Sequence, residues 1–219
     1  MNKRKYKNVV ITKKGENSIL RGHPWIYNGE IIKQEVVNNG ELVDVTNEKG
    51  SYLGTGFYNN NSKITVRLIS RNANDTFDED FFKRRIRYAW DYRKQVMAKD
   101  LNCCRIIFGE ADGMPGLTVD KFNDIIVVQI LSLGIEVRKD IILHGLLEVM
   151  KEDKIDIKGI YERNDVPIRK LEGMEENKGW YNYGSEIPDK TTTEIVENDI
   201  KYIVDFENGQ KTGFFLDQK

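Results

Sequence analysis

The chain has 219 residues, of which 39% are hydrophobic and 32% are charged, and its formal net charge is −1. This composition is typical of a folded protein with one large domain or two small ones, and it excludes a disordered or low-complexity chain. No stretch approaches the ~18 apolar residues of a membrane span, and the basic N-terminus lacks the apolar run of a signal peptide, so we expect a cytoplasmic protein.

Residues 1–74 show short strand patterns separated by turn signals. Gly54 and Gly56 interrupt one of these patterns and indicate a bend or the close approach of another backbone. Strands this short, spaced by turns, are typical of a small β-barrel. The expected elements are strands at residues 9–12, 26–27, 30–32, 42–45, 52–58 and 64–69, with a short helix at 13–21.

Residues 75–190 predict a second domain that mixes helices and strands. Thr76 or Asp78 is placed to cap a helix whose first turn is acidic. Apolar residues recur through this helix at helical spacing, which predicts one buried face. Residues 125–131 are almost continuously apolar, as expected for a central strand covered on both faces. The other predicted elements are strands at 105–108, 117–120, 159–163 and 167–171 and a helix at 136–151.

Residues 191–219 begin with a predicted β-hairpin over residues 194–205, with a tight turn at Asn198 and Asp199. The chain then ends soon after an apolar run at residues 214–216. An exposed run of this kind favours aggregation, so we expect it to pack against further structure. The fold class is therefore α+β, with domains at residues 1–74, 75–190 and 191–219.

Four segments carry a resemblance to a known family. In this order and at this spacing, they resemble the PUA-domain-containing class I S-adenosylmethionine-dependent methyltransferases that make 5-methylcytosine in large-subunit ribosomal RNA. The resemblance extends over the whole chain. The four segments are RGHPWIY at residues 21–27, GEADGMPGLTVD at 109–120, ERNDVPIRKLEG at 162–173 and GQKTGFFLDQ at 209–218.

The resemblance implies a PUA-like RNA-binding barrel, a central α+β domain and a terminal hairpin leading into a Rossmann-type methyltransferase domain, before which this chain ends. It also implies large-subunit ribosomal RNA as partner, and it is compatible with a homodimer. Half of a concave pocket does not bury a ligand, so we expect no S-adenosylmethionine bound to this chain. The residues that match one side of the family's cofactor pocket are Lys211, Thr212, Gly213, Phe215, Asp217 and Gln218.

Methylation of cytosine at C5 requires a thiolate that adds to C6. Cys103 and Cys104 are the only cysteines, and neither has the Pro-Cys or Ser-Cys setting that the family uses. Both precede an apolar strand, which favours buried, unreactive thiols. The cysteines and the two histidines, His23 and His144, show no metal-ligand spacing. We therefore expect no catalytic residue, no metal site and no catalysis by this chain alone.

Because the net charge is near zero, an RNA site has to arise from a local arrangement of cations and aromatic rings. Trp25 offers a stacking surface, and Arg21 and His23 offer donors to phosphate or base. The alternative is that Trp25 anchors the barrel core, with the histidine bonded locally. Arg67 and Arg71 end the last barrel strand and extend a basic track, unless they serve solubility at a sheet edge.

The long helix contributes further candidates. Arg84 and Arg87 are candidates for phosphate contact, although such cations also form solvated faces balanced by nearby acids. Glu110 and Asp112 lie in a glycine-rich turn. Without a metal or cofactor beside them, paired carboxylates here favour turn formation and hydrogen bonds at a domain interface over acid-base chemistry.

Two cations of the third segment are candidates for contacting RNA that lies across both domains, namely Arg169 and Lys170. The alternative is an ion-pair clasp in which Arg163, Asp165 and Arg169 meet on neighbouring strands.

Three functions follow from these patterns. The first is the RNA-binding N-terminal portion of the methyltransferase. The second is a stand-alone RNA-binding or ribosome-assembly module. The third is a protein-interaction module that dimerises through the apolar run at residues 214–216.

Overall fold

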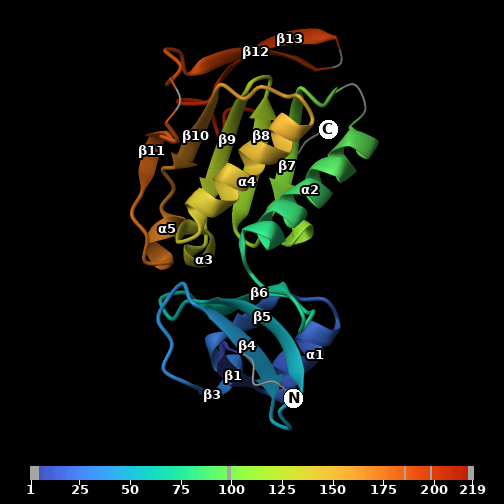
Figure 1. The fold of residues 1–219 in the computed structure, drawn as a ribbon. Helices are drawn as coiled ribbons and strands as arrows, with labels where there is room; N and C mark the ends of the chain where they lie inside the picture. The colour runs from blue at the N-terminus through green and yellow to red at the C-terminus, as the bar shows by residue number, and fades with distance from the viewer. Residues whose placement is uncertain (1–4, 98–99, 185, 198, 217–219) are drawn as a thin grey trace.

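The structure is a computed structural model that describes residues 5–97, 100–184, 186–197 and 199–216. It is a mixed α+β fold, as the sequence predicts, and it consists of two bodies joined by the segment that follows β6 (Figure 1). The N-terminal body holds a six-stranded sheet, and the larger body holds a five-stranded sheet and a separate hairpin.

The N-terminal sheet is strongly curved and has the strand order β2-β6-β5-β4-β1-β3, in which β1 and β4 are parallel (Figure 1). Its core is apolar and includes Val9, Ile26 and Val66. A Cβ atom at Gly56 would lie 2.4 Å from the Arg67 carbonyl oxygen, so the predicted close approach of two backbones is confirmed. The elements are β1 (Lys7–Ile11), α1 (Lys13–Leu20), β2 (Trp25–Tyr27), β3 (Ile31–Gln34), β4 (Leu42–Asn47), β5 (Tyr52–Tyr58) and β6 (Ile64–Ser70).

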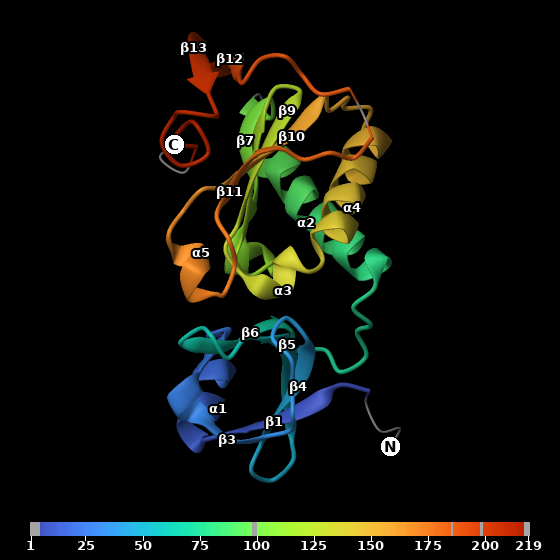
Figure 2. The same cartoon turned by 90° about the vertical axis from the view of Figure 1, so that its left-hand side faces the viewer.

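The central sheet has the order β11-β10-β9-β8-β7, with one parallel pair, β9 and β10. Helices α2 and α4 lie side by side and cover one of its faces (Figure 2). The elements are α2 (Glu79–Val96), β7 (Cys103–Phe108), a 3-10 turn η3 (Gly109–Asp112), β8 (Leu117–Phe122), β9 (Ile125–Ile130), α3 (Leu133–Glu136), α4 (Lys139–Glu152), β10 (Gly159–Asn164), α5 (Ile168–Leu171) and β11 (Asn177–Trp180).

The predicted strand at residues 167–171 is wrong, because these residues form the short helix α5. The reason is the side chain of Arg169, which is 3% exposed. Its guanidinium donates to the Ile130 carbonyl at 2.6 Å and to Glu136 at 3.0 Å, contacts that fix it beneath the sheet edge. Tertiary anchoring of this kind overrides a short local pattern.

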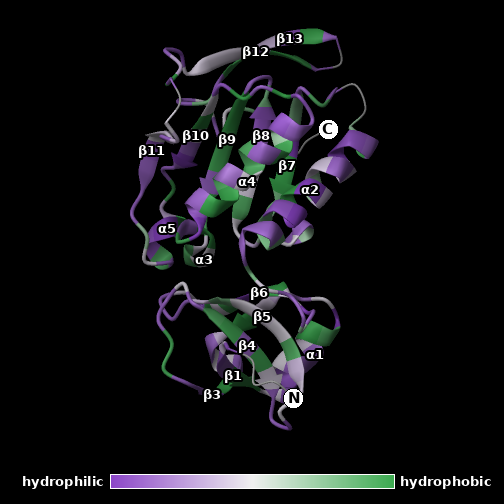
Figure 3. Cartoon of the chain, in the orientation of Figure 1, coloured by the Kyte–Doolittle hydropathy of each residue, from purple (hydrophilic) through white to green (hydrophobic). Residues whose placement is uncertain are grey.

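Helix α2 forms as its sequence predicts. The Asp78 side chain accepts a hydrogen bond from the Phe81 backbone at 3.0 Å and so caps the helix. Phe82, Ile86 and Trp90 are buried against the sheet. Figure 3 shows the resulting contrast, with largely hydrophobic strands β7 and β9 behind a largely hydrophilic α2.

Helices α2 and α4 are joined by an ion-pair network centred on Asp153. Its carboxylate accepts hydrogen bonds from Lys94 at 2.6 Å, Trp90 at 2.8 Å and Arg87 at 2.8 Å. The hydrogen bond from Lys94 is the largest cause that lowers the pKa of Asp153, to about 2, with those from Trp90 and Arg87 adding to it. The charged form of this carboxylate therefore stabilises the folded chain.

This network predicts a pH-dependent effect of the Asp153→Asn substitution. A carboxylate with a lowered folded-state pKa contributes its stability above the unfolded pKa of about 4 and loses it as the pH falls through the folded pKa. We expect the variant to be less stable than the wild type by about 2 kcal/mol near pH 7. Urea unfolding should show this difference unchanged down to about pH 5 and shrinking toward pH 2. Glu148→Gln, whose side chain is 61% exposed and pairs with Lys83, is the control; an equal loss there would contradict the prediction.

The hairpin and C-terminal segment cover part of the second face of the central sheet. The hairpin consists of β12 (Thr192–Glu197) and β13 (Ile200–Asp205), in the predicted place. Phe206 and Leu216 are buried in a cluster with sheet residues such as Phe122, and Phe214 packs against that cluster. Two side chains of the apolar terminal run thus pack within the chain, while Phe215 remains 36% exposed.

No helix in the described ranges is long and apolar enough to span a bilayer. Among the same residues, no group of three or more His, Cys, Asp or Glu side chains is arranged to hold a metal ion. Cys103 and Cys104 are buried and not joined in a disulfide.

Candidate nucleic-acid interface

A cavity of about 530 Å³ lies where the N-terminal body meets α2 and the turn η3. We call it the junction cavity. Its walls come from three parts of the chain: the turn after α1, the end of β6 with the segment that follows, and α2 with η3. The lining residues are Gly22, His23, Pro24, Leu68, Ile69, Ser70, Arg71, Asn72, Asp75, Arg84, Arg85, Tyr88, Glu110 and Gly113.

The turn after α1 presents His23 at the rim of the cavity. Gly22 has φ 98°, a left-handed conformation that ends the helix, and its N–H donates to the Ile19 carbonyl at 2.9 Å. The Pro24 carbonyl accepts from the Leu68 backbone at 2.8 Å, which fixes the turn on β6. His23 is exposed, and its Nδ1 accepts from the Trp25 backbone at 3.2 Å. The imidazole is thus held with one ring edge toward solvent.

A second hollow of about 760 Å³ also has His23 in its lining, together with Arg21 and Lys14. Arg21 is exposed at the end of α1. Two of the predicted RNA-contacting side chains, Arg21 and His23, therefore lie on one accessible surface of the N-terminal body.

Trp25 is half-buried at the junction of the two bodies and is not part of the barrel core, so the alternative prediction of a core anchor is wrong. Its indole Nε1 donates to Glu110 at 2.7 Å, and the Arg67 guanidinium lies 5.6 Å from its ring centre. The prediction that Glu110 serves a domain interface is confirmed by this contact. Asp112 accepts from the Phe108 backbone at 2.6 Å and from Arg93 at 2.7 Å, so it supports the turn as predicted.

Arg67 also joins the two bodies. Its guanidinium donates to Glu172 at 2.8 Å, with the two side chains 12% and 4% exposed. Asn59 donates to the same carboxylate at 3.0 Å and to the Glu172 carbonyl at 2.8 Å. We call Arg67, Asn59 and Glu172 the interdomain clasp. Arg67 is therefore engaged within the chain, and we leave it out of the RNA surface.

Three arginines line the junction cavity from two directions. Arg71 is exposed and, among the described residues, makes no hydrogen bond or ion pair. Arg84 lies 3.4 Å from Asp75, and Arg85 donates to the Ile69 carbonyl at 3.3 Å. The sequence placed Arg71 and Arg84 among the candidates. Arg85 and Tyr88 also line the cavity. The sequence could have indicated Tyr88, because it lies one helical turn after Arg84 and therefore on the same face of α2.

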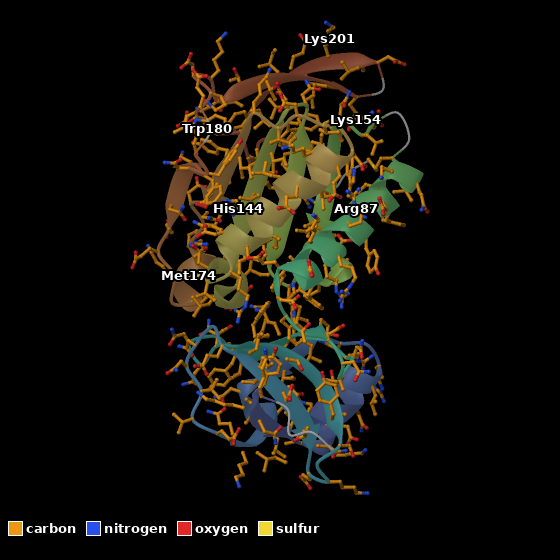
Figure 4. All side chains as sticks on the ribbon, in the orientation of Figure 1. Arg87, His144, Lys154, Met174, Trp180 and Lys201 are labelled. Carbon is orange, nitrogen blue, oxygen red and sulfur yellow. The ribbon has the colours of Figure 1, made fainter. Side chains whose placement is uncertain are left out.

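The remaining residues predicted to contact RNA each have an acidic partner within the chain. Arg87 turns toward α4, where it pairs with Glu152 at 2.5 Å and with Asp153 (Figure 4). Arg169 is buried by the contacts that form α5 and does not meet Arg163. Lys170 is exposed but pairs with Glu176 at 2.8 Å, at the opposite edge of the sheet from α2 (Figure 1). None of these three lines the junction cavity.

Arg163 holds the C-terminal segment to the sheet. It donates to the Phe206 carbonyl at 2.7 Å and to the Gly209 carbonyl at 2.9 Å, and it pairs with Asp165 at 3.0 Å. The predicted clasp is thus correct for Arg163 and Asp165 and wrong for Arg169, which has other partners.

Some of the residues predicted to line half of a cofactor pocket pack against the rest of the chain. Thr212 is 1% exposed and donates its hydroxyl hydrogen to Asp120. Gly213 has φ 119°, and a Cβ there would lie 2.8 Å from Phe206. The Lys211 ammonium lies 4.8 Å from the centre of the Phe215 ring. The last two residues of the set, Asp217 and Gln218, lie outside the described residues.

Comparison with known proteins agrees with this architecture. A family model for a PUA-like domain matches residues 9–71. The chain is 37% identical over 213 residues to ribosomal RNA large subunit methyltransferase I of Enterobacter sp. (strain 638) and of Escherichia coli (strain SMS-3-5 / SECEC). These alignments cover 96% of this chain and 52% of each relative, so the chain spans about half the length of the curated relatives it matches.

Two solved structures have a similar fold. One is described as a candidate SAM-dependent methyltransferase from Streptococcus mutans, with a TM-score of 0.75 and 22% identity. The other is described as a candidate methyltransferase complexed with SAH, with a TM-score of 0.76 and 21% identity. Each alignment covers 96% of this chain and 51% of the other.

Proposed function

We propose that this chain is the RNA-binding portion of an S-adenosylmethionine-dependent methyltransferase that forms 5-methylcytosine in large-subunit ribosomal RNA. The PUA-like match and the likeness to ribosomal RNA methyltransferases support an RNA partner. The observation that carries the proposal is the junction cavity, because it gathers Arg71, Arg84 and Arg85 beside the exposed His23. Cations gathered in this way bind the phosphates of RNA.

The described residues contribute RNA contacts and no nucleophile in this proposal. Cys103 and Cys104 are both 0% exposed within β7, and as neighbours in a strand they point to opposite faces of the sheet. Neither thiol is accessible to a cytosine ring. The chain by itself is therefore proposed to be inactive in methyl transfer.

The described part of the C-terminal segment does not fit S-adenosylmethionine by itself. The Thr212 hydroxyl is committed to Asp120, and the backbone at Gly213 packs against Phe206. Both residues therefore hold the C-terminal segment against the rest of the chain. S-adenosylmethionine would supply the methyl group when bound, and in this proposal the residues of this chain hold the RNA.

The proposal predicts RNA binding that weakens steeply with salt. Fluorescence anisotropy with a labelled fragment of large-subunit ribosomal RNA should show log Kd rising linearly with log salt concentration. Arg71→Gln removes one phosphate contact, so it should weaken binding about three- to tenfold and reduce the slope by about 1. Lys201→Gln, which removes one cation from the hairpin at the far end of the molecule, should change neither value (Figure 4).

Absence of RNA binding at low salt would overturn the RNA-binding proposal for this chain. An unchanged salt dependence of Kd in Arg71→Gln would show that the junction cavity takes no part in RNA binding. The methylation itself is tested in cells: deletion of the gene should abolish one 5-methylcytosine in large-subunit ribosomal RNA, and an unaltered set of 5-methylcytosines would refute it.

A further inference from the structure

The junction cavity combines a charged wall with an exposed aromatic side chain. Tyr88 lines the cavity and is 61% exposed. Tyr92, one helical turn further along α2, is 54% exposed and does not line it. A tyrosine exposed to this extent beside a basic hollow offers its ring face to a planar ligand.

The charges in the cavity favour an anion. Its two carboxylates already accept hydrogen bonds within the chain, Asp75 from Ser70 and Glu110 from Trp25 at 2.7 Å. Arg71 and Arg85, by contrast, have no carboxylate within ion-pair distance among the residues that the structure describes. Two guanidinium groups therefore retain donors for a phosphate, the anion that their planar geometry suits.

The size of the cavity suits one nucleotide. A volume of about 530 Å³ falls within the range of roughly 300–1,000 Å³ typical of sites that enclose a single small ligand. Its lining also contains the largely buried side chains of Leu68 and Ile69. Guanidinium groups, apolar side chains and a tyrosine ring together match a phosphate joined to a base.

We infer that the junction cavity binds one unpaired nucleotide of RNA, with its phosphate at Arg71 and Arg85 and its base against the Tyr88 ring. The inference rests on the proposed RNA-binding function and names the form of RNA that the site selects. A duplex keeps its bases paired and stacked inside the helix, so it reaches the rim with phosphates alone. Only an unpaired base enters a concave site and stacks on a side chain.

The interdomain contacts keep this site formed before RNA arrives. His23 belongs to the N-terminal body and Tyr88 to the central body. The hydrogen bond from Trp25 to Glu110 joins the two bodies beside the cavity. The interdomain clasp joins them at a second place, outside the cavity lining. A preformed site loses less conformational entropy on binding than one that must assemble.

The test compares a labelled single-stranded RNA of about ten nucleotides with the same strand annealed to its complement, both titrated against the full chain. We expect the wild type to bind the single strand at least tenfold more tightly than the duplex. Tyr88→Ala should weaken single-strand binding about tenfold and leave duplex binding unchanged, because stacking on the tyrosine is lost while the phosphate contacts remain. Tyr92→Ala, on the same helix and similarly exposed, should retain the wild-type preference.

Equal affinity for the single strand and the duplex would overturn the inference and leave the proposed RNA-binding function standing. The inference also fails, on its own, if Tyr88→Ala keeps the full preference or if Tyr92→Ala loses as much of it. Absence of binding to either RNA at low salt would overturn both proposals. Circular dichroism of each variant shows whether it is folded, which both exposed positions are expected to allow.

Discussion

Replacing Glu172 by alanine is expected to lower the free energy of unfolding by about 3 kcal/mol, because the substitution removes the nearer carboxylate of the largely buried Arg67, which retains Glu110 at 3.7 Å. Glu172 is 3% exposed and accepts from both Arg67 and Asn59 across the interface. Removing the nearer member of a buried ion pair is costly, since the remaining charge keeps only a longer, weaker contact. Urea unfolding followed by circular dichroism measures the loss.

The control for this prediction is a surface ion pair from the same part of the chain. Glu176 pairs with Lys170, which is 67% exposed, so Glu176→Ala should cost less than about 1 kcal/mol. Glu172→Ala should also weaken RNA binding, because the two walls of the junction cavity belong to the two bodies that the clasp joins. The prediction is wrong if Glu172→Ala and Glu176→Ala destabilise the chain equally.

Local sequence patterns predict most of the elements because their causes are local. The cap at Asp78, the apolar run that forms β9 and the glycines of β5 each act over a few residues. Helix α5 was missed because its cause is distant, since Arg169 reaches the Ile130 carbonyl 39 positions away. β11 was missed because Asn177–Trp180 lacks alternating apolar residues. Its backbone pairs with β10 at the sheet edge.

The candidate site was predicted as separate cations and not as one cavity. His23, Arg71 and Arg84 were each singled out from the sequence, and the structure places them around the same hollow. Their convergence depends on how the two bodies dock. That docking rests on contacts between residues far apart in the chain, such as Trp25 with Glu110 and Arg67 with Glu172. A local sequence pattern does not predict contacts between residues this far apart in the chain.

Long-range contacts also explain why some arginines that the sequence predicts to contact RNA have acidic partners within the chain. Arg67, Arg87 and Arg169 look alike in the sequence, because each directly follows an apolar residue. Each finds an acidic partner on another element: Glu172 for Arg67, and α4 or α3 for the other two. Arginine geometry suits a carboxylate as well as a phosphate, so composition alone does not separate the two uses.

Asp120 is the residue on which the attachment of the C-terminal segment is expected to depend most. It is 0% exposed and accepts two hydrogen bonds from Arg105, at 2.7 and 2.9 Å, and one from the Thr212 hydroxyl. Asp120→Ala removes all three, and we expect a loss of about 3 kcal/mol because Arg105 is left largely buried beside an apolar residue. Thr212→Val removes only the hydroxyl, so about 1 kcal/mol should be lost.

The release of this segment is measured directly by limited trypsin digestion. Lys211 is exposed at its backbone turn, and cleavage there requires the segment to leave the sheet. The rate of cutting after Lys211, followed by mass spectrometry, should rise strongly in Asp120→Ala and modestly in Thr212→Val. Asp124→Asn, which breaks only the surface pair with Lys158, should match the wild type. If Asp120→Ala is cut no faster than Asp124→Asn, the buried carboxylate does not anchor the segment, and Arg163 and the apolar cluster hold it alone.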